Sequence, residues 1–314
     1  MPFSSIVYSQ GSTDDDPRNS QSHSLTDAAR SARRMNSYEL EALQLALDDY
    51  VESIVDSDFP NSNLENASWL HVLPSTTPLL IFQYRVPIGS VRHFGNEVTQ
   101  HGRYGAVATV VKSGIITIVP YGGIGTVVVR LKPESASVVI GEEIEAFADR
   151  KVGLDHVFGR EAIALLDEQL HAARTSSDRV SLVTRFLHAK IGTRIPDRAI
   201  SHAVQALRLD PNTRISSLAH DTSGRQFFRQ FQKIVGTTPK RFSRLARFEK
   251  VMAARLSGMN WAELSYASGF SDQAHMINDV ATILGAPPER ALNMVLGHRK
   301  EDRHKPGKKH FFLW

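Results

Sequence analysis

The order of hydrophobic and polar positions changes along the chain, and each pattern predicts a different structure. Residues 1–36 are rich in Ser, Asp, Asn, Gln and Arg and have almost no periodic apolar positions, which predicts a disordered tail. From Ser37, apolar residues recur every three or four positions, so we expect an amphipathic helix capped by Ser37. The expected stripe comprises Leu40, Leu43, Leu47, Tyr50, Val51 and Ile54.

Between Trp69 and Leu131 the pattern changes to short β-branched and aromatic runs separated by Gly and Pro. The runs that predict strands are 79–84, 106–111, 115–119 and 127–131. The short turn signals at 112–114 and 121–123 favour hairpins, so the sequence predicts a small, mostly antiparallel β region.

Helical periodicity returns at 144–148, 160–173 and 178–191, so residues 37–191 are predicted to form an α+β domain with flanking helices. The apolar positions between Arg160 and Ile191 are the expected surface of a homodimer. From Pro196 onward the pattern predicts helices only, which indicates an all-α domain. The expected helices are 197–209, 213–220, 224–235, 239–257, 260–267, 272–284 and 288–296.

The net charge of +4 is the sum of two opposite halves. Residues 1–189 hold 16 Lys and Arg against 23 Asp and Glu, a net charge of −7, and residues 190–314 hold 21 against 10, a net charge of +11. A basic half joined to an acidic half is expected when one domain binds a polyanion and the other has a different task.

Composition excludes several classes of function. The chain has no cysteine, which rules out disulfides, thiolate catalysis, Cys-ligated zinc and iron–sulfur clusters. It has neither an apolar run of membrane-spanning length nor a secretory leader, so a cytoplasmic location without membrane contact is expected. The histidines are scattered: His71, His93 and His101 lack a ligand-like spacing. We therefore expect neither a metal site nor a cofactor.

The segment 224–235 combines a cationic face with an apolar one. Arg225, Arg229 and Lys233 are four residues apart and share a face, with Gln226 and Gln230 beside them. Phe228, Phe231 and Val235, with Phe227 and Ile234 beside them, form the expected apolar face. Arg and Gln make bidentate contacts to guanine and adenine in the major groove, so this helix is a candidate for base recognition.

The residues that follow extend this segment into a longer motif, Arg229, Phe231, Gly236, Thr238, Pro239, Phe242 and Arg247. A second set begins at Trp261 and continues through Gly269, Phe270, Gln273, His275, Gly285 and Pro288. In this order and spacing, residues 196–298 resemble the AraC-type DNA-binding module. The resemblance implies two helix-turn-helix units joined by a helix over 240–256, carrying Lys240 and Arg241, that enter successive major grooves of double-stranded DNA. It also implies transcriptional activation through RNA polymerase.

The sequence departs from this family in both units. The turn before the first recognition helix is about two residues shorter than the family pattern. No Lys or Arg occurs between Arg255 and Arg290, and Asp272 and Asp279 lie on or near the second recognition helix. Since acidic residues weaken attraction to phosphates, the first unit is expected to dominate affinity. Weaker polar contacts are expected from Gln273, His275 and Asn278.

The amino-terminal half resembles the sensor-like domain that precedes this module in one branch of the family. The likeness rests on Leu73-Pro74, on 125–133 and on 152–159. It implies a ligand-binding or dimerisation domain without identifying the small-molecule effector.

Two other functions remain open from the sequence. A degenerate member would bind proteins instead of DNA. An enzyme would need His71, Arg85, His93 or Arg130 in a cleft of the β region, but no nucleophile elbow, P-loop or dinucleotide motif accompanies them. Related DNA-repair methyltransferases are excluded because their chemistry needs a cysteine.

Residues 299–314 form the expected basic tail, able to add phosphate contacts. The final 311–314 segment, Phe-Phe-Leu-Trp, is unusual for a solvated tail and is expected to dock on the protein or on a partner. The expected organisation is therefore a tail at 1–36, an α+β domain at 37–191, a DNA-binding domain at 192–298 and this basic tail.

Overall fold

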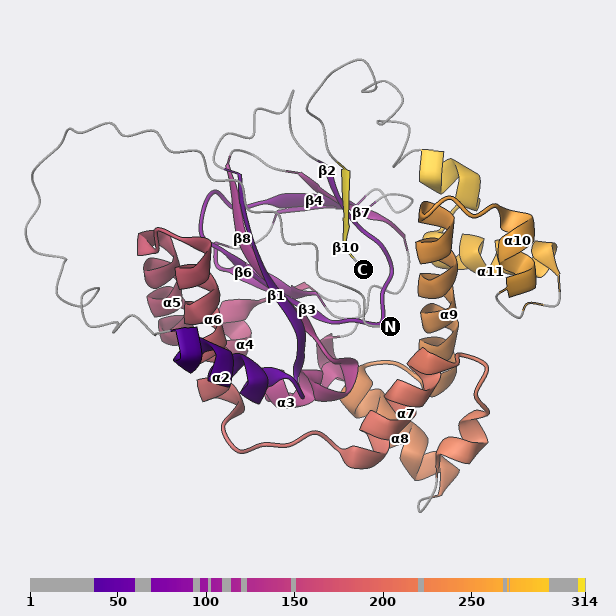
Figure 1. Cartoon of the computed structure of the whole chain (residues 1–314), viewed down its shortest axis with the longest axis horizontal. Coiled ribbons are helices and arrows are strands. Elements are labelled where there is room, and N and C mark those ends of the chain that lie inside the picture. The colour runs from indigo at the N-terminus through magenta and orange to yellow at the C-terminus, as the bar shows by residue number, and fades with distance from the viewer. Residues whose placement is uncertain are drawn as a thin grey trace, which may run out of the picture. The chain divides into compact units, whose positions relative to one another are not determined.

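A computed structural model describes residues 37–59, 69–92, 97–100, 103–108, 114–119, 123–147, 151–219, 223–267, 270, 272–293 and 310–313 (Figure 1). The predicted tail at 1–36 lies outside these residues, as do most residues of the tail at 299–314. In the described part of the chain, no helix is long and apolar enough to cross a membrane.

The first helix is shorter than the apolar stripe predicted. Helix α2 (Ser37–Leu47) ends before Asp48, and strand β1 (Val51–Phe59) begins three residues later. Tyr50, Val51 and Ile54 therefore do not continue the helix, and that part of the prediction was wrong. β1 pairs with strand β8 (Ile124–Leu131) from Val51 opposite Leu131 to Phe59 opposite Ile124, so strand pairing outweighs the local helical periodicity.

Two five-stranded sheets form the β region. Sheet A has the order β1-β8-β3-β6-β9 and is antiparallel throughout, while sheet B has the order β10-β2-β7-β4-β5. The remaining strands are β2 (Trp69–Val72), β3 (Leu79–Gln83), β4 (Gly89–Arg92), β5 (Glu97–Gln100), β6 (Gly105–Ala108), β7 (Ile116–Val119), β9 (Lys151–Gly153) and β10 (His310–Leu313). The prediction of a mostly antiparallel β region is confirmed.

The predicted hairpins are wrong. β6 pairs with β3 and β9 in sheet A, whereas β7 pairs with β2 and β4 in sheet B. β8 pairs with β1 and β3, so these three consecutive strands alternate between the sheets instead of pairing with each other. The short connections between these strands therefore lead from one sheet to the other instead of forming hairpins.

Helices cover sheet A and share its core. They are α3 (Ala136–Ile140), α4 (Leu154–Phe158), α5 (Arg160–Ala172) and α6 (Ser176–Ile191), with 3-10 turns η1 (Pro133–Ser135) and η2 (Ile144–Phe147). The segment predicted as a helix at 144–148 is thus a 3-10 turn. One apolar cluster joins α5 and α6 to the sheet, and its members include Leu166, Leu170, Val183, Leu187, Leu80, Val127 and Val129.

This packing corrects the dimer surface predicted from the same helices. Ile163, Leu166 and Leu170 of α5 and Leu182, Val183, Leu187 and Ile191 of α6 are all buried inside the chain. These buried apolar positions stabilise this domain and are not available to a second copy, whereas Leu165 is exposed.

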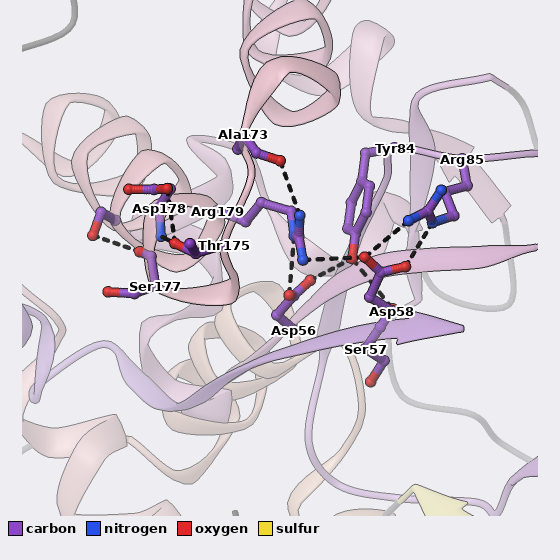
Figure 2. A network of polar contacts seen from close by, with 11 residues as sticks. Asp56, Ser57, Asp58, Tyr84, Arg85, Ala173, Thr175, Ser177, Asp178 and Arg179 are labelled. Carbon is purple, nitrogen blue, oxygen red and sulfur yellow. Dashed lines mark hydrogen bonds and ion pairs between the residues drawn. The ribbon is translucent and has the colours of Figure 1, made fainter. Parts of the chain in front are cut away.

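A buried polar network fastens α6 to sheet A (Figure 2). The Arg179 guanidinium donates from Nε to Asp56 Oδ2 at 3.0 Å and from Nη2 to Asp58 Oδ2 at 3.2 Å, and it lies 4.6 Å from the centre of the Tyr84 ring. The Tyr84 hydroxyl donates to Asp56 Oδ1 at 2.7 Å, and Arg85 pairs with Asp58. Each charge in this network has an opposite charge within reach, so burial is tolerated.

The carboxyl-terminal helices closely follow the predicted segments. They are α7 (Arg198–Leu209), the 3-10 turn η3 (Ile215–Leu218), α8 (Gly224–Val235), α9 (Pro239–Leu256), α10 (Trp261–Ala267) and α11 (Gln273–Leu284), followed by helical residues 288–293. The predicted all-α region after the α+β region is confirmed, as is the helix predicted over 224–235.

These helices pack around two separate apolar cores. The first joins α7, η3 and α8 to Phe242 at the start of α9. The second joins the later part of α9 to α10, α11 and residues 286–292, and it also contains Leu73 and Ile115 of the β region. The second core is therefore completed by residues far away in the sequence.

The prediction that the closing segment docks on the protein is confirmed for residues 310–313. β10 lies parallel to β2, with His310 opposite Trp69 and Leu313 opposite Val72. In Figure 1 the yellow arrow of β10 lies alongside β2. It is the only parallel pair among the described strands.

Candidate nucleic-acid interface

Helix α8 has defined signals at both ends. The Ser223 side chain accepts a hydrogen bond from the Gln226 backbone N–H at 3.3 Å, and Gly236 ends the helix in the left-handed conformation with φ of 80°. A side chain at position 236 would also place its Cβ 2.7 Å from Ile144 Cγ2. Only glycine adopts this left-handed conformation easily and also leaves room for the nearby segment that contains Ile144.

The two faces of α8 differ as predicted, apart from one aromatic residue. Phe227, Phe231 and Val235 are buried, and Arg225, Gln226, Arg229 and Gln230 are exposed. Phe228, which the sequence placed on the apolar face, is 40% exposed because positions 225, 228 and 229 share a side of the helix.

The amino-terminal half of α8 is the part open to a ligand. Within the described part of the chain, neither Arg225 nor Arg229 has an ion-pair partner. Recognition helices contact base edges with their amino-terminal residues, which makes these two guanidinium groups and Phe228 the best placed on this helix. The exposed aromatic ring is a candidate that sequence reasoning missed.

The carboxyl-terminal half of α8 faces the amino-terminal region. Lys233 Nζ donates to Glu143 Oε1 at 2.5 Å, and Gln232 Nε2 donates to Glu145 Oε1 at 2.6 Å. Both carboxylates therefore bind side chains of α8. Lys233, predicted to contact DNA, is thus paired within the chain. The opposite net charges of the two halves were the sequence feature that favoured an ion pair between them.

A cleft of about 570 Å³ lies beside this contact. Its walls come from α3 and the residues after it, from the linker at Arg194 and Ile195, and from Gln230, Lys233 and Ile234 of α8. The cleft therefore touches two of the residues predicted to bind DNA.

Helix α9 begins with an N-cap in which the Thr238 side chain accepts from the Arg241 N–H at 3.3 Å, with Pro239 in the first turn. The predicted contacts Lys240 and Arg241 are both exposed at this end. With 18 residues, α9 is about 27 Å long, enough to span much of the distance between successive major grooves on one side of DNA.

The second unit presents a polar helix. Gln273, His275 and Asn278 of α11 are exposed, as the predicted contacts require. The His275 ring lies 5.5 Å from that of Phe270, edge to face. Exposure alone leaves the roles of these three residues as predictions.

The two acidic residues of the second unit have structural partners. The Asp272 side chain caps α11 by accepting from the His275 N–H at 2.7 Å. Asp279 pairs with Arg244 of α9 at 2.5 Å and is mostly buried. The repulsion of phosphates expected from this acidic pair is therefore reduced, chiefly because Arg244 neutralises Asp279.

The residues considered for metal binding or catalysis have other roles. His71 Nδ1 lies 3.0 Å from the Thr117 hydroxyl, Arg85 pairs with Asp58, and Arg130 pairs with Glu52. His93 and His101 are outside the described residues. Among the residues described, no three His, Cys, Asp or Glu side chains gather as a metal site would require.

Residues 216–294 match the family model described as a helix-turn-helix domain. No curated protein matches the chain in sequence. Among solved structures, ToxT from Vibrio cholerae O395 matches with 12% identity over 79% of this chain and 96% of that chain, at a TM-score of 0.38. Unsaturated fatty acid-bound ToxT from Vibrio cholerae strain SCE256 matches with 10% identity over 79% and 94%, at a TM-score of 0.38.

Proposed function

We propose that this chain is a DNA-binding transcriptional regulator, that residues 216–294 form an AraC-type helix-turn-helix domain, and that the first unit of this domain dominates DNA affinity. In this proposal the chain has no catalytic role. The observation that carries the proposal is the exposed amino-terminal half of α8, where Arg225 and Arg229 flank Phe228.

In the proposed binding mode, α8 enters the major groove. Arg225 and Arg229 contact guanine edges or phosphates, Gln226 and Gln230 contact adenine edges, and Phe228 contacts a thymine methyl group. Lys240 and Arg241 add phosphate contacts, and Lys233 joins them when it leaves Glu143. In the second unit, Gln273, His275 and Asn278 make weaker polar contacts in the next groove.

The other parts of the chain have proposed roles that rest on the family resemblance. Residues 37–191 act as a sensor or dimerisation domain, 192–298 bind DNA, and the basic tail at 299–314 adds phosphate contacts. Activation through RNA polymerase is proposed on the same basis. The cleft beside Lys233 is the proposed place for a small-molecule effector, because a ligand there would touch α8 directly. A homodimer would need a surface other than the buried faces of α5 and α6.

The test is a titration of the full chain against duplexes selected by the wild-type protein from a random pool. Arg225→Ala and Arg229→Ala should each weaken binding about 10- to 100-fold, the effect of losing one bidentate contact. Asn278→Ala should weaken it less, by under about tenfold. The proposal is wrong if both arginine variants bind normally while Asn278→Ala abolishes binding, and absence of wild-type binding at low salt would favour a protein-binding module.

A further inference from the structure

A carboxylate of the central helix α9 is held by a loop of the amino-terminal region. Glu249 Oε1 accepts from the Ser75 hydroxyl at 2.6 Å and from the Thr76 backbone N–H at 2.6 Å. The Thr76 hydroxyl lies 3.2 Å from Oε1 and 3.0 Å from Oε2. Both oxygens of this carboxylate are therefore bound by the loop between β2 and β3.

The loop is built to present these donors. Ser75, Thr76 and Thr77 are at most 4% exposed, and the Ser75 hydroxyl also accepts from the Thr77 N–H at 3.1 Å. Pro74 and Pro78 flank the three residues and restrict their backbone. One N–H and two hydroxyls directed at one point form a small binding site for a carboxylate, which we call the Ser75–Thr76 nest.

Apolar contacts beside the nest connect the loop to the second helix-turn-helix unit. Leu73 is fully buried in the core that contains Leu245, Phe248 and Met252, which lie on the same side of α9 as Glu249. The Gly114 N–H donates to the Ile283 carbonyl of α11 at 2.9 Å. The β region therefore holds both α9 and α11.

Other charged groups lie close to the nest. Glu52 of β1 pairs with Arg208 of α7 and with Arg130 of β8, whose guanidinium also reaches the Thr77 hydroxyl at 3.5 Å. Interaction with Glu52, and then with Glu249 and Glu134, raises the pKa of Arg208 despite its burial. The Glu249 carboxylate is thus part of a mixed set of charges, and removal of its donors would leave it partly buried without direct partners.

We propose that the Ser75–Thr76 nest is a latch through which the amino-terminal region sets the position of the second helix-turn-helix unit, with Glu249 as its ligand. The first unit has a separate core, which Glu249 and Leu73 do not enter. Release of the latch therefore loosens α10 and α11 while α8 keeps its packing. The inference rests on the proposed function only where DNA binding is concerned.

Hydrogen–deuterium exchange of the full chain tests the latch without DNA. In Glu249→Ala, amides in 261–284 should exchange at least about tenfold faster, while those in 224–235 remain unchanged. Glu→Ala removes the equivalent of one acetate, so sodium acetate should restore slow exchange, and sodium chloride at equal ionic strength should not. In the double variant Glu249→Ala/Thr76→Val, acetate should not restore slow exchange, because the Thr76 hydroxyl that would bind it is absent. The matched control is Glu168→Ala on the exposed face of α5, with no effect expected.

Footprinting on the selected duplex gives the second readout. Wild type should protect two segments about 34 Å apart, and Glu249→Ala should keep the first and lose the second until acetate is added. Unchanged exchange in 261–284, or equal acceleration in 224–235, would overturn the latch. If exchange behaves as expected but wild type protects no duplex, the latch stands and the proposed DNA-binding function fails.

Discussion

At the scale of single residues, several buried or half-buried charges of this protein pair with an opposite charge inside the chain. Arg179 illustrates the energetic consequence. Its guanidinium is buried with Asp56 and stacks on the Tyr84 ring, and burial together with the hydrogen bond to Asp56 raises the pKa of the tyrosine hydroxyl. The network is therefore stable only while both signs of charge are present.

Arg179→Met should destabilise the protein by about 3–5 kcal/mol, because the carboxylates of Asp56 and Asp58 would keep their negative charge with less compensation. Urea unfolding followed by circular dichroism measures the change. Arg174→Met, at an exposed position of the preceding loop, should change stability by about 0.5 kcal/mol or less. Equal effects of the two substitutions would contradict a structural role for the network.

Glu134 provides a prediction about pH. It is 4% exposed, burial raises the pKa of its carboxyl group, and Oε2 has no hydrogen-bond donor among the described residues. As pH rises above the usual carboxyl pKa of about 4.3, the unfolded chain loses this proton first, so the folded state loses relative stability up to its own raised pKa.

Glu134→Gln removes this ionisation and should be more stable than wild type at neutral pH. The difference should shrink as pH falls below the usual carboxyl range, where both side chains are neutral. Urea midpoints of the two proteins across a pH series check the prediction. A difference that stays constant with pH would show that Glu134 does not titrate in this way.

At the scale of elements, the sequence predicted helices better than strand pairing. The segment 224–235 was predicted with its observed bounds because Ser223 and Gly236 mark its ends and its faces separate cleanly. The runs predicted at 79–84 and 115–119 contain the observed strands 79–83 and 116–119, but their pairing partners were not predicted, because neighbouring runs enter different sheets. The local pattern specifies a strand, whereas the topology depends on contacts between distant residues.

Gly236 gives an element-scale prediction. Gly236→Ala should cost about 1–2 kcal/mol from the left-handed backbone, with a further loss because the new Cβ meets Ile144. Gly258→Ala is the matched control, since it has φ of 109° and no atom within 4 Å of the added Cβ. If Gly236→Ala lowers the free energy of unfolding in urea more than Gly258→Ala does, the difference measures the clash with Ile144. Equal decreases would mean that only the left-handed backbone opposes the substitution.

At the scale of the whole molecule, the acidic and basic halves of the chain make polar contacts with each other. Sequence reasoning found the opposite charges and the exposed residues of α8 but could not place Glu143 on Lys233 or Ser75 on Glu249. These contacts join segments far apart in the sequence, and no local pattern encodes them. The charge imbalance indicated only that such contacts were available.

Glu143→Gln should release Lys233 and raise DNA affinity of the full chain about two- to fivefold, with the slope of log K against log salt steeper by about 0.9 for one added phosphate contact. Glu142→Gln removes the same charge from a neighbouring exposed residue that has no hydrogen bond to α8 within the described chain. It should leave the slope unchanged. A steeper slope in both variants would indicate a general effect of charge and not release of Lys233.

The parallel pairing of β10 with β2 has a consequence for biosynthesis. β2 is translated early, but the strand that covers its edge follows all the helices of the DNA-binding region in the chain. During translation the β2 edge therefore stays open to pairing with other nascent chains. Sheet B is completed only after helices α7 to α11 have left the ribosome, so the β region and the helical region reach their final form together.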